Sequence, residues 1–163
     1  MKIGILLTIV ALFGFGSAPL CAEDYHQGPS GGSGGEPFED GNLPEGARVS
    51  EVRVWAGGAV DAIQFVLEAA GQFYELPKHG GGGGTINVFT LLSDELLTGI
   101  SGLYNGRIGQ IRFHTSSGRS SAPYGRGGKA EFSFEAPAGG QIVGLFGRAG
   151  GMVDALGAIT RDP

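Results

Sequence analysis

The chain has 163 residues, a formal net charge of −5 and 33 glycines. So much glycine excludes a helical bundle, because a glycine inside a helix costs about 1 kcal/mol, and the absence of a Gly-X-Y period excludes collagen. A hydrophobic fraction of 41% is too high for a disordered chain. The acidic balance argues against a nucleic-acid partner, which requires a surplus of Lys and Arg.

The amino end has the composition of a secretory signal peptide. Lys2 provides a positive charge, an apolar run covers residues 3–15, and small residues follow before the acidic pair Glu23-Asp24. The run is shorter than the about 20 residues needed to cross a bilayer, so we expect no membrane span. We predict cleavage after Ala22 in preference to Ala18. The exported chain, residues 23–163, would then contain no cysteine and no disulfide.

Residues 23–163 predict a single all-β domain. Short apolar segments rich in Val, Ile and Phe alternate with clusters of Gly, Pro, Ser and Asn, as is typical of strands and turns. We expect about ten to twelve short strands. Residues 91–98 come nearest to a helical period and could form one helical turn. Asp94 and Glu95 in that stretch are expected to be solvated turn residues. The apolar segments lie at 49–55, 60–67, 86–92, 96–103, 108–113, 132–134, 142–146 and 153–159.

Two motifs recur along the chain. The segment AGGAVDAI at 56–63 returns as AGGMVDAL at 149–156, with only two positions changed. Glycine clusters recur at 31–35 and 80–84 and, more weakly, at 124–128; their last glycines are Gly35, Gly84 and Gly128. A third hairpin-like segment, YNGRIGQIRF at 104–113, contains Gly106 but has Gln110 where we align the Asp of the other two.

A hairpin and a glycine loop repeated three times predict three small sheets around a pseudo-threefold axis. In that arrangement the loop at 31–35 lies beside the last hairpin, at 149–156. Each of the other two loops lies beside the hairpin that precedes it.

The order of these motifs resembles the jacalin-related lectin domain. The segments that carry the resemblance are GPSGGSGG near the start, VSEVRVW, GGAVDAIQF, YGRGG and the closing GLFGRAGGMVDALGAI. It covers about residues 28–160 and implies a β-prism I fold of three four-stranded Greek-key sheets. It also implies carbohydrate binding without metal, and we expect no cofactor and no catalysis. Two intact pairs of glycine loop and Gly-x-x-x-Asp motif resemble the mannose-binding, banana-lectin-like members.

A carboxylate can accept hydrogen bonds from two adjacent sugar hydroxyls, and a glycine backbone can approach a ligand closely because no Cβ intrudes. The resemblance implies one acceptor, two backbone donors and one closing loop glycine in each site. These are Asp154, Gly151, Met152 and Gly35 in the first site, and Asp61, Gly58, Ala59 and Gly84 in the second. The third unit, with neutral Gln110, is expected to be lost or weaker.

The choice of sugar is less tightly indicated. The residues after Gly35, Glu36-Pro37-Phe38, resemble the opening of the galactose-binding branch, yet no signal for excision of the loop is evident. An uncut loop implies mannose or glucose. Each site should be weak, with a dissociation constant on the order of 0.1–10 mM, and two sites per chain allow a gain from avidity on a dense glycan surface.

A second hypothesis is a secreted scaffold that binds protein partners or sulfated polysaccharide. Its basis is a set of basic residues around the third unit: Arg107, Arg112, Arg119, Arg126 and Lys129. The sequence is also compatible with a homodimer formed through exposed strand edges.

Catalytic and metal-binding roles are not favoured by the sequence. A glycosidase needs two carboxylates about 5–10 Å apart, and we expect Asp61 and Asp154 in separate sites. His26, His79 and His114 lack the spacing of zinc ligands. His79 lies beside the second glycine loop and could contact a bound sugar.

Overall fold

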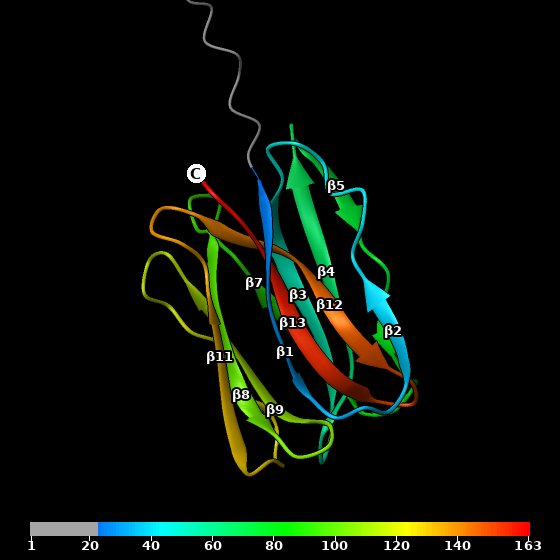
Figure 1. Cartoon of the computed structure of the whole chain (residues 1–163). Coiled ribbons are helices and arrows are strands. Elements are labelled where there is room, and N and C mark those ends of the chain that lie inside the picture. The colour runs from blue at the N-terminus through cyan, green and yellow to red at the C-terminus, as the bar shows by residue number, and fades with distance from the viewer. Residues whose placement is uncertain (1–22) are drawn as a thin grey trace, which may run out of the picture.

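The computed structural model describes residues 23–163, and the predicted signal peptide at 1–22 lies outside them. In the described part all regular structure is β-strand, arranged as three antiparallel sheets around a common core (Figure 1). No helix within residues 23–163 is long and apolar enough to cross a membrane.

The first sheet brings both ends of the described chain together. Its strand order is β1-β13-β12-β2. The strands are β1 (Asp24–Gly31), β2 (Glu36–Glu39), β12 (Gln141–Ala149) and β13 (Val153–Arg161). A long hairpin, β12–β13, forms the centre, and the two flanking strands are joined by the glycine loop at 31–35.

The other two sheets repeat this plan. The second has the order β5-β4-β3-β7, with β6 also paired to β4. The third has the order β10-β9-β8-β11. In the second sheet the strands are β3 (Arg48–Ala56), β4 (Val60–Ala69), β5 (Gln72–Glu75), β6 (His79–Gly80) and β7 (Thr85–Thr90). In the third they are β8 (Leu97–Tyr104), β9 (Ile108–Thr115), β10 (Tyr124–Gly125) and β11 (Ala130–Glu135).

The predicted β-prism of three sheets is therefore confirmed, with a fifth strand in the second sheet. Residues 91–96 form a turn and no helix. The thirteen strands exceed our expectation because β6 and β10 have only two residues each, too few to leave a period in the sequence.

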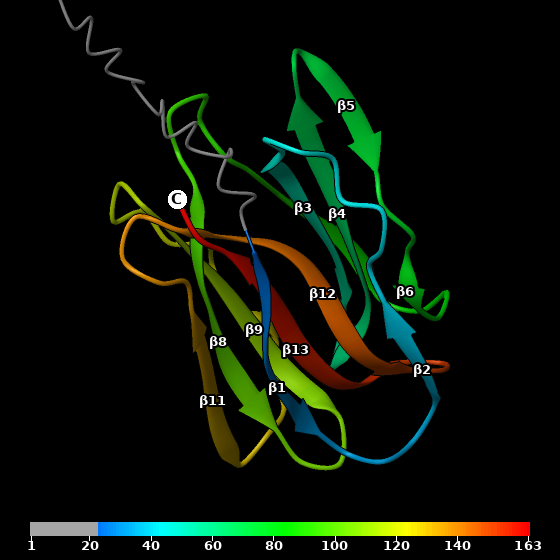
Figure 2. The same cartoon turned by 45° about the horizontal axis from the view of Figure 1, so that its top comes forward.

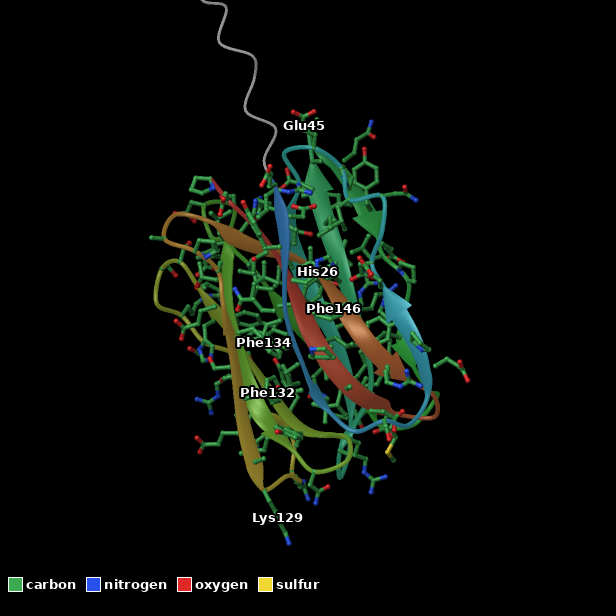
Figure 3. The ribbon with its side chains drawn as sticks, viewed as in Figure 1. His26, Glu45, Lys129, Phe132, Phe134 and Phe146 are labelled. Carbon is green, nitrogen blue, oxygen red and sulfur yellow. The ribbon has the colours of Figure 1, made fainter. Side chains whose placement is uncertain are left out.

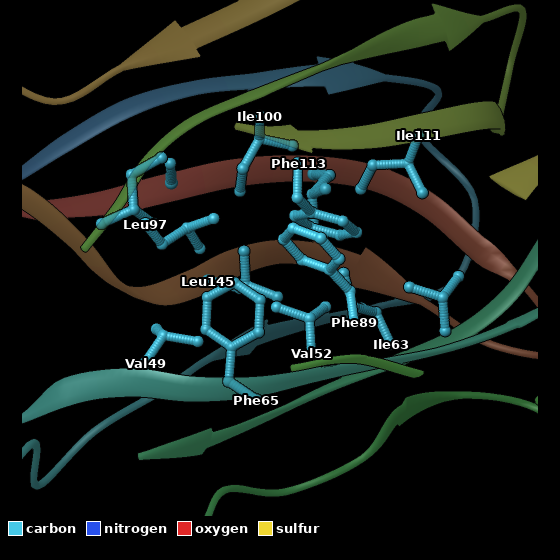
Figure 4. Close-up of a cluster of buried hydrophobic side chains, with 14 of the residues drawn as sticks. Val49, Val52, Ile63, Phe65, Phe89, Leu97, Ile100, Ile111, Phe113 and Leu145 are labelled. Carbon is cyan, nitrogen blue, oxygen red and sulfur yellow. The ribbon is translucent and has the colours of Figure 1, made fainter. Parts of the chain in front are cut away.

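The three sheets turn their apolar faces toward one core. Phe65 from the second sheet and Phe113 from the third are fully buried and meet edge to face, with ring centroids 6.4 Å apart. Val52, Ile100 and Leu145 complete the cluster from all three sheets (Figure 4). Because every sheet covers one side of this core, the ends of the three hairpins are held in a fixed mutual position.

Glu95 corrects one of our expectations. Its side chain is 1% exposed and not solvated. Arg119 donates to it from Nε at 2.9 Å and from Nη2 at 2.6 Å, and the Thr115 hydroxyl and the Leu92 amide also donate. Arg119, one of the five basic residues considered as a polyanion patch, is therefore neutralised by an internal partner.

Candidate functional site

The three hairpin turns lie at one end of the prism, the lower end in Figures 1 and 2. They connect β3 to β4, β8 to β9 and β12 to β13. Each turn is closed by the same backbone hydrogen bond, from one residue to the residue two positions later. The bonds are Gly57 N–H to Ala59 O (3.0 Å), Asn105 N–H to Arg107 O (3.0 Å) and Gly150 N–H to Met152 O (2.9 Å).

A glycine loop covers each turn in the predicted pairing. The amide of Gly32 donates to the carbonyl of Asp154 at 2.8 Å, so the first loop lies on the last hairpin. The Gly81 amide donates to the Asp61 carbonyl at 2.9 Å, and the Gly127 amide to the Gly109 carbonyl at 3.1 Å. The second and third loops therefore lie on the hairpins that precede them.

The carboxylates of Asp154 and Asp61 are in contact with the loop backbones. A methyl group placed on Gly34 would lie 2.6 Å from Asp154 Oδ1, and one on Gly83 would lie 2.5 Å from Asp61 Oδ1. One on Gly35 or on Gly84 would lie 2.6 Å from the corresponding Oδ2. Any side chain at these loop positions would therefore displace the carboxylate, and the two sites agree closely in this geometry.

No group within residues 23–163 donates a hydrogen bond to either carboxylate. Both carboxylates reach solvent, because none of their oxygens is fully buried without a partner. Asp61 is only 8% exposed, so a nearly buried carboxylate retains its acceptor capacity and reaches solvent. Asp40, 3% exposed, differs because it accepts from His79 Nε2 at 2.7 Å and from the Leu145 amide at 2.9 Å. The two site carboxylates can therefore accept hydrogen bonds from a ligand's hydroxyl groups.

The turns beside these carboxylates are open on their outer side. A methyl group on Gly58 or on Gly151 would meet no atom within 4 Å. The structure thus brings together all the residues predicted for each site: one aspartate, its turn and its loop glycine.

The two loops are held differently. Arg148 donates from Nε to Gly34 O at 3.0 Å and from Nη2 to Gly35 O at 2.7 Å, which fixes the first loop. Trp55 takes the corresponding position beside the second loop, and its ring is covered by Lys78 Nζ at 4.1 Å from the centroid. From the sequence, Arg148 is expected to be a structural partner of a carboxylate or a carbonyl and not a ligand contact, and the two loop carbonyls confirm the structural role.

His79 is committed to structure. It stacks on Phe38 with ring centroids 3.9 Å apart and bonds to Asp40, so its side chain is enclosed. Figure 2 shows the two strands concerned, β6 and β2, near each other. This places the imidazole in the body of the protein, away from the ligand contact that the sequence left open.

The third unit requires a correction of register. Its turn bond starts at Asn105, which therefore corresponds to Gly57 and Gly150. The position of the missing aspartate is thus Gly109, and not Gln110. Gln110 instead donates from Nε2 to Gly125 O at 3.4 Å. The alignment was one residue off because we matched the glycine at 106 to a turn position that Asn105 occupies.

No group of three His, Cys, Asp or Glu side chains that could hold a metal ion is found in the part of the chain that the structure describes. His26 pairs with Glu39 at 2.9 Å. His114 lies between the hydroxyls of Ser101 and Ser120, at 2.7 and 2.8 Å.

Comparisons with known proteins agree with this fold. The model of the jacalin-like lectin domain matches residues 27–159. Jacalin-related lectin 19 of Arabidopsis thaliana is 36% identical over 138 residues, which cover 80% of this chain and 76% of that protein. Malaysian banana lectin superposes with a TM-score of 0.74 at 28% identity, over 85% of this chain and 98% of that one. AcmJRL, a mannose-binding jacalin-related lectin from Ananas comosus, superposes with a TM-score of 0.71 at 28% identity, over 84% and 96%.

Proposed function

The chain belongs to the jacalin-like lectin family, and from that membership we propose that it is a secreted lectin with two binding sites for mannose- or glucose-containing glycans. Asp154 is the acceptor in the first site and Asp61 in the second. Secretion is proposed from the composition of residues 1–22, and N-terminal sequencing of the exported protein tests it.

The observation that carries this proposal is the pair of carboxylates without donors beneath the glycine loops. Asp61 is nearly buried and Asp154 partly buried, and free acceptor capacity at two equivalent positions suits a ligand that supplies hydroxyl donors. Adjacent hydroxyls of a hexose can bond to the two oxygens of one carboxylate. The amides of Gly151 and Met152, and those of Gly58 and Ala59, are the proposed donors to the remaining sugar oxygens.

Mannose or glucose is favoured by two considerations. The chain continues uninterrupted through the loop at 31–35 into β2, and the similar pineapple protein is described as mannose-binding. No catalytic role is proposed, because Asp61 and Asp154 lie beneath different loops and do not form the carboxylate pair of a glycosidase.

Substitution of the two aspartates tests the proposal. Asp61→Asn and Asp154→Asn keep the side-chain shape but remove the charge, which should weaken each site by at least about tenfold, since hydrogen bonds to charged groups contribute about 1.5–3 kcal/mol. Calorimetric titration with methyl mannoside should give two sites in the parent, one in each single variant and none in the double variant.

Asp94→Asn is the matched control, because Asp94 is an exposed residue of the turn at 91–96 and belongs to neither glycine loop and to no hairpin turn. In the calorimetric titration with methyl mannoside this variant should give two sites, as the parent does. A double variant that binds methyl mannoside as tightly as the parent would show that the sites have been placed wrongly.

A further inference from the structure

The third unit, which lacks an aspartate, contains a pocket. A cavity of about 320 Å³ lies between the third unit and the turn of the second site. Its lining consists of Asn105, Arg107, Gly109, Gly127 and Gly128 of the third unit, Gly58, Ala59 and Asp61 of the second site, and Met152 of the first. Small-molecule sites have volumes of about 300–1,000 Å³, so this one is large enough for a sugar unit. It is continuous with the second site because Asp61 belongs to both.

The sequence of the third unit shapes one wall of this cavity. Gly109 has no side chain, and the third loop lies directly on it: a methyl group on Gly109 would lie 2.2 Å from Gly127 C and 2.6 Å from Gly128 N. The third loop is also shorter, since it runs from Gly125 to Gly128 whereas the others run over 31–35 and 80–84. The loop therefore fills the position that the aspartate side chain takes in the other two units, and the cavity lies beside it, toward the turn of the second site.

Arg107 gives this pocket a guanidinium with free donors, whereas Arg148 at the first site donates to the carbonyls of its loop. The Arg107 guanidinium has no carboxylate partner among the described residues, and its only polar contact there is from Nη1 to Met152 Sδ at 3.3 Å. A thioether is a weak acceptor, so the guanidinium keeps its capacity for an oxyanion. By contrast, Arg48, Arg53, Arg119 and Arg161 are all in ion pairs.

The surrounding sheet is basic although the chain as a whole is acidic. Residues 97–135 contain five Lys or Arg against two Glu, in a protein of formal charge −5. Arg119 is paired with Glu95, which leaves four cations against two Glu in this range. Lys129 lies at the tip of the end that carries the hairpin turns, and Glu45 lies at the opposite end (Figure 3). The local field therefore favours a negative group at the third unit.

We propose that the third unit binds an anionic sugar unit, one that carries a carboxylate or a sulfate ester and is linked to the neutral sugar held by Asp61. The guanidinium of Arg107 would take the anionic group, because its planar donor fork fits two oxyanion oxygens at once. The free carboxylate of Asp61 would take hydroxyls of the adjoining sugar. This proposal rests on the proposed function of the Asp61 site.

The same pocket disfavours a continuous polyanion such as heparin. Asp61 places a negative charge within it, which would repel a chain with an anionic group on every unit. A single anionic unit next to a neutral one avoids that repulsion. The pocket therefore selects for the order of sugar units as well as for charge.

Titration of one binding site with matched ligands tests this proposal. Asp154→Asn serves as the background, so that only the Asp61 site reports. The probes are a glucuronic acid–mannose disaccharide, the same disaccharide with glucose in place of glucuronic acid, and a sulfated mannose disaccharide. We expect the anionic probes to bind about tenfold more tightly than the neutral one, which corresponds to about 1.4 kcal/mol; the two anionic arms show whether a carboxylate or a sulfate is preferred.

Arg107→Gln in this background should reduce the ratio of anionic to neutral affinity to about one. Arg112→Gln is the control for net charge. Arg112 belongs to the same sheet but lines a different surface hollow, with Ser101 and His114, so the ratio should be retained. Equal binding of neutral and anionic probes in the parent, or a preference that survives Arg107→Gln, would overturn the proposal while leaving the Asp61 site standing. If the Asp154→Asn protein with Arg107 intact bound neither the anionic probes nor the neutral one, both this proposal and the proposed function of the Asp61 site would be overturned.

Discussion

The carboxylate of Glu95 is enclosed by donors, whereas those of Asp61 and Asp154 have none within residues 23–163. The hydrogen bond from Arg119 holds the pKa of Glu95 well below its usual range, and the amide of Leu92 and the hydroxyls of Ser117 and Thr115 act in the same direction against the effect of burial. Glu95 is thus charged at neutral pH and structural, while the acceptor capacity of the two aspartates remains available to a ligand.

The lowered pKa of Glu95 predicts an acid-sensitive contribution to stability. Because the carboxyl group binds a proton more weakly in the folded state, its contribution is complete above the unfolded pKa of about 4.3 and is lost as pH falls below it. Glu95→Gln should lower the free energy of unfolding at pH 7 by about 1–3 kcal/mol, the cost of losing charged hydrogen bonds. Urea denaturation at pH 7 and at pH 3 measures this.

At pH 3 the difference between Glu95→Gln and the parent should be smaller, because the contribution declines between the unfolded pKa and the lower folded pKa, and Asp94→Asn should match the parent at pH 7. A Glu95→Gln variant as stable as the parent at pH 7 would contradict this account. The sequence did not indicate this buried acid, because its partner Arg119 is 24 positions away and a polar turn such as SDE looks solvated.

The glycine loop is the element that completes each site, and the second loop offers a direct test. Gly84 has a φ of 74°, and a methyl group there would meet Asp61 Oδ2 at 2.6 Å. Gly84→Ala should therefore remove the second site, so that calorimetric titration with methyl mannoside gives one site per chain. Gly82→Ala is the control from the same loop, because a methyl group at Gly82 meets nothing within 4 Å. Two titrating sites in Gly84→Ala would refute this role of the loop.

At the level of elements, the repeats predicted the pairing of loops with hairpins because each unit carries its own copy of both. They failed in the third unit, where Asn105 replaces the first turn glycine and the loop is shorter. Because the third unit has neither the aspartate nor the first turn glycine, no residue in its sequence shows how it should be aligned with the other two units. The backbone hydrogen bond of the turn supplies that marker, and only the structure shows it.

The whole molecule closes in a ring of glycine contacts that the sequence did not show. Each loop covers its own hairpin and also approaches the turn of another sheet. A methyl group on Gly32 would meet Gly106 O at 2.1 Å, one on Gly81 would meet Gly151 O at 2.3 Å, and one on Gly127 would meet Gly58 O at 3.2 Å. These contacts join residues far apart in the chain, so each copy of the motif looks self-contained in the sequence although its site is bounded by a neighbour.

This ring predicts that one substitution disturbs two sites. In Gly81→Ala the methyl group must push the second loop away from the carbonyl of Gly151, which lies in the turn of the first site. Methyl mannoside should then bind more weakly at both Asp61 and Asp154, and the free energy of unfolding should fall by about 1–3 kcal/mol, as is usual for overpacking. In Gly127→Ala the methyl group is farther from the facing carbonyl, that of Gly58, and the substitution should have a smaller effect on the free energy of unfolding.

Titration of Gly81→Ala with methyl mannoside in the Asp61→Asn and Asp154→Asn backgrounds resolves the two sites separately. Weakening confined to the Asp61 site would mean that the first site does not depend on the second loop.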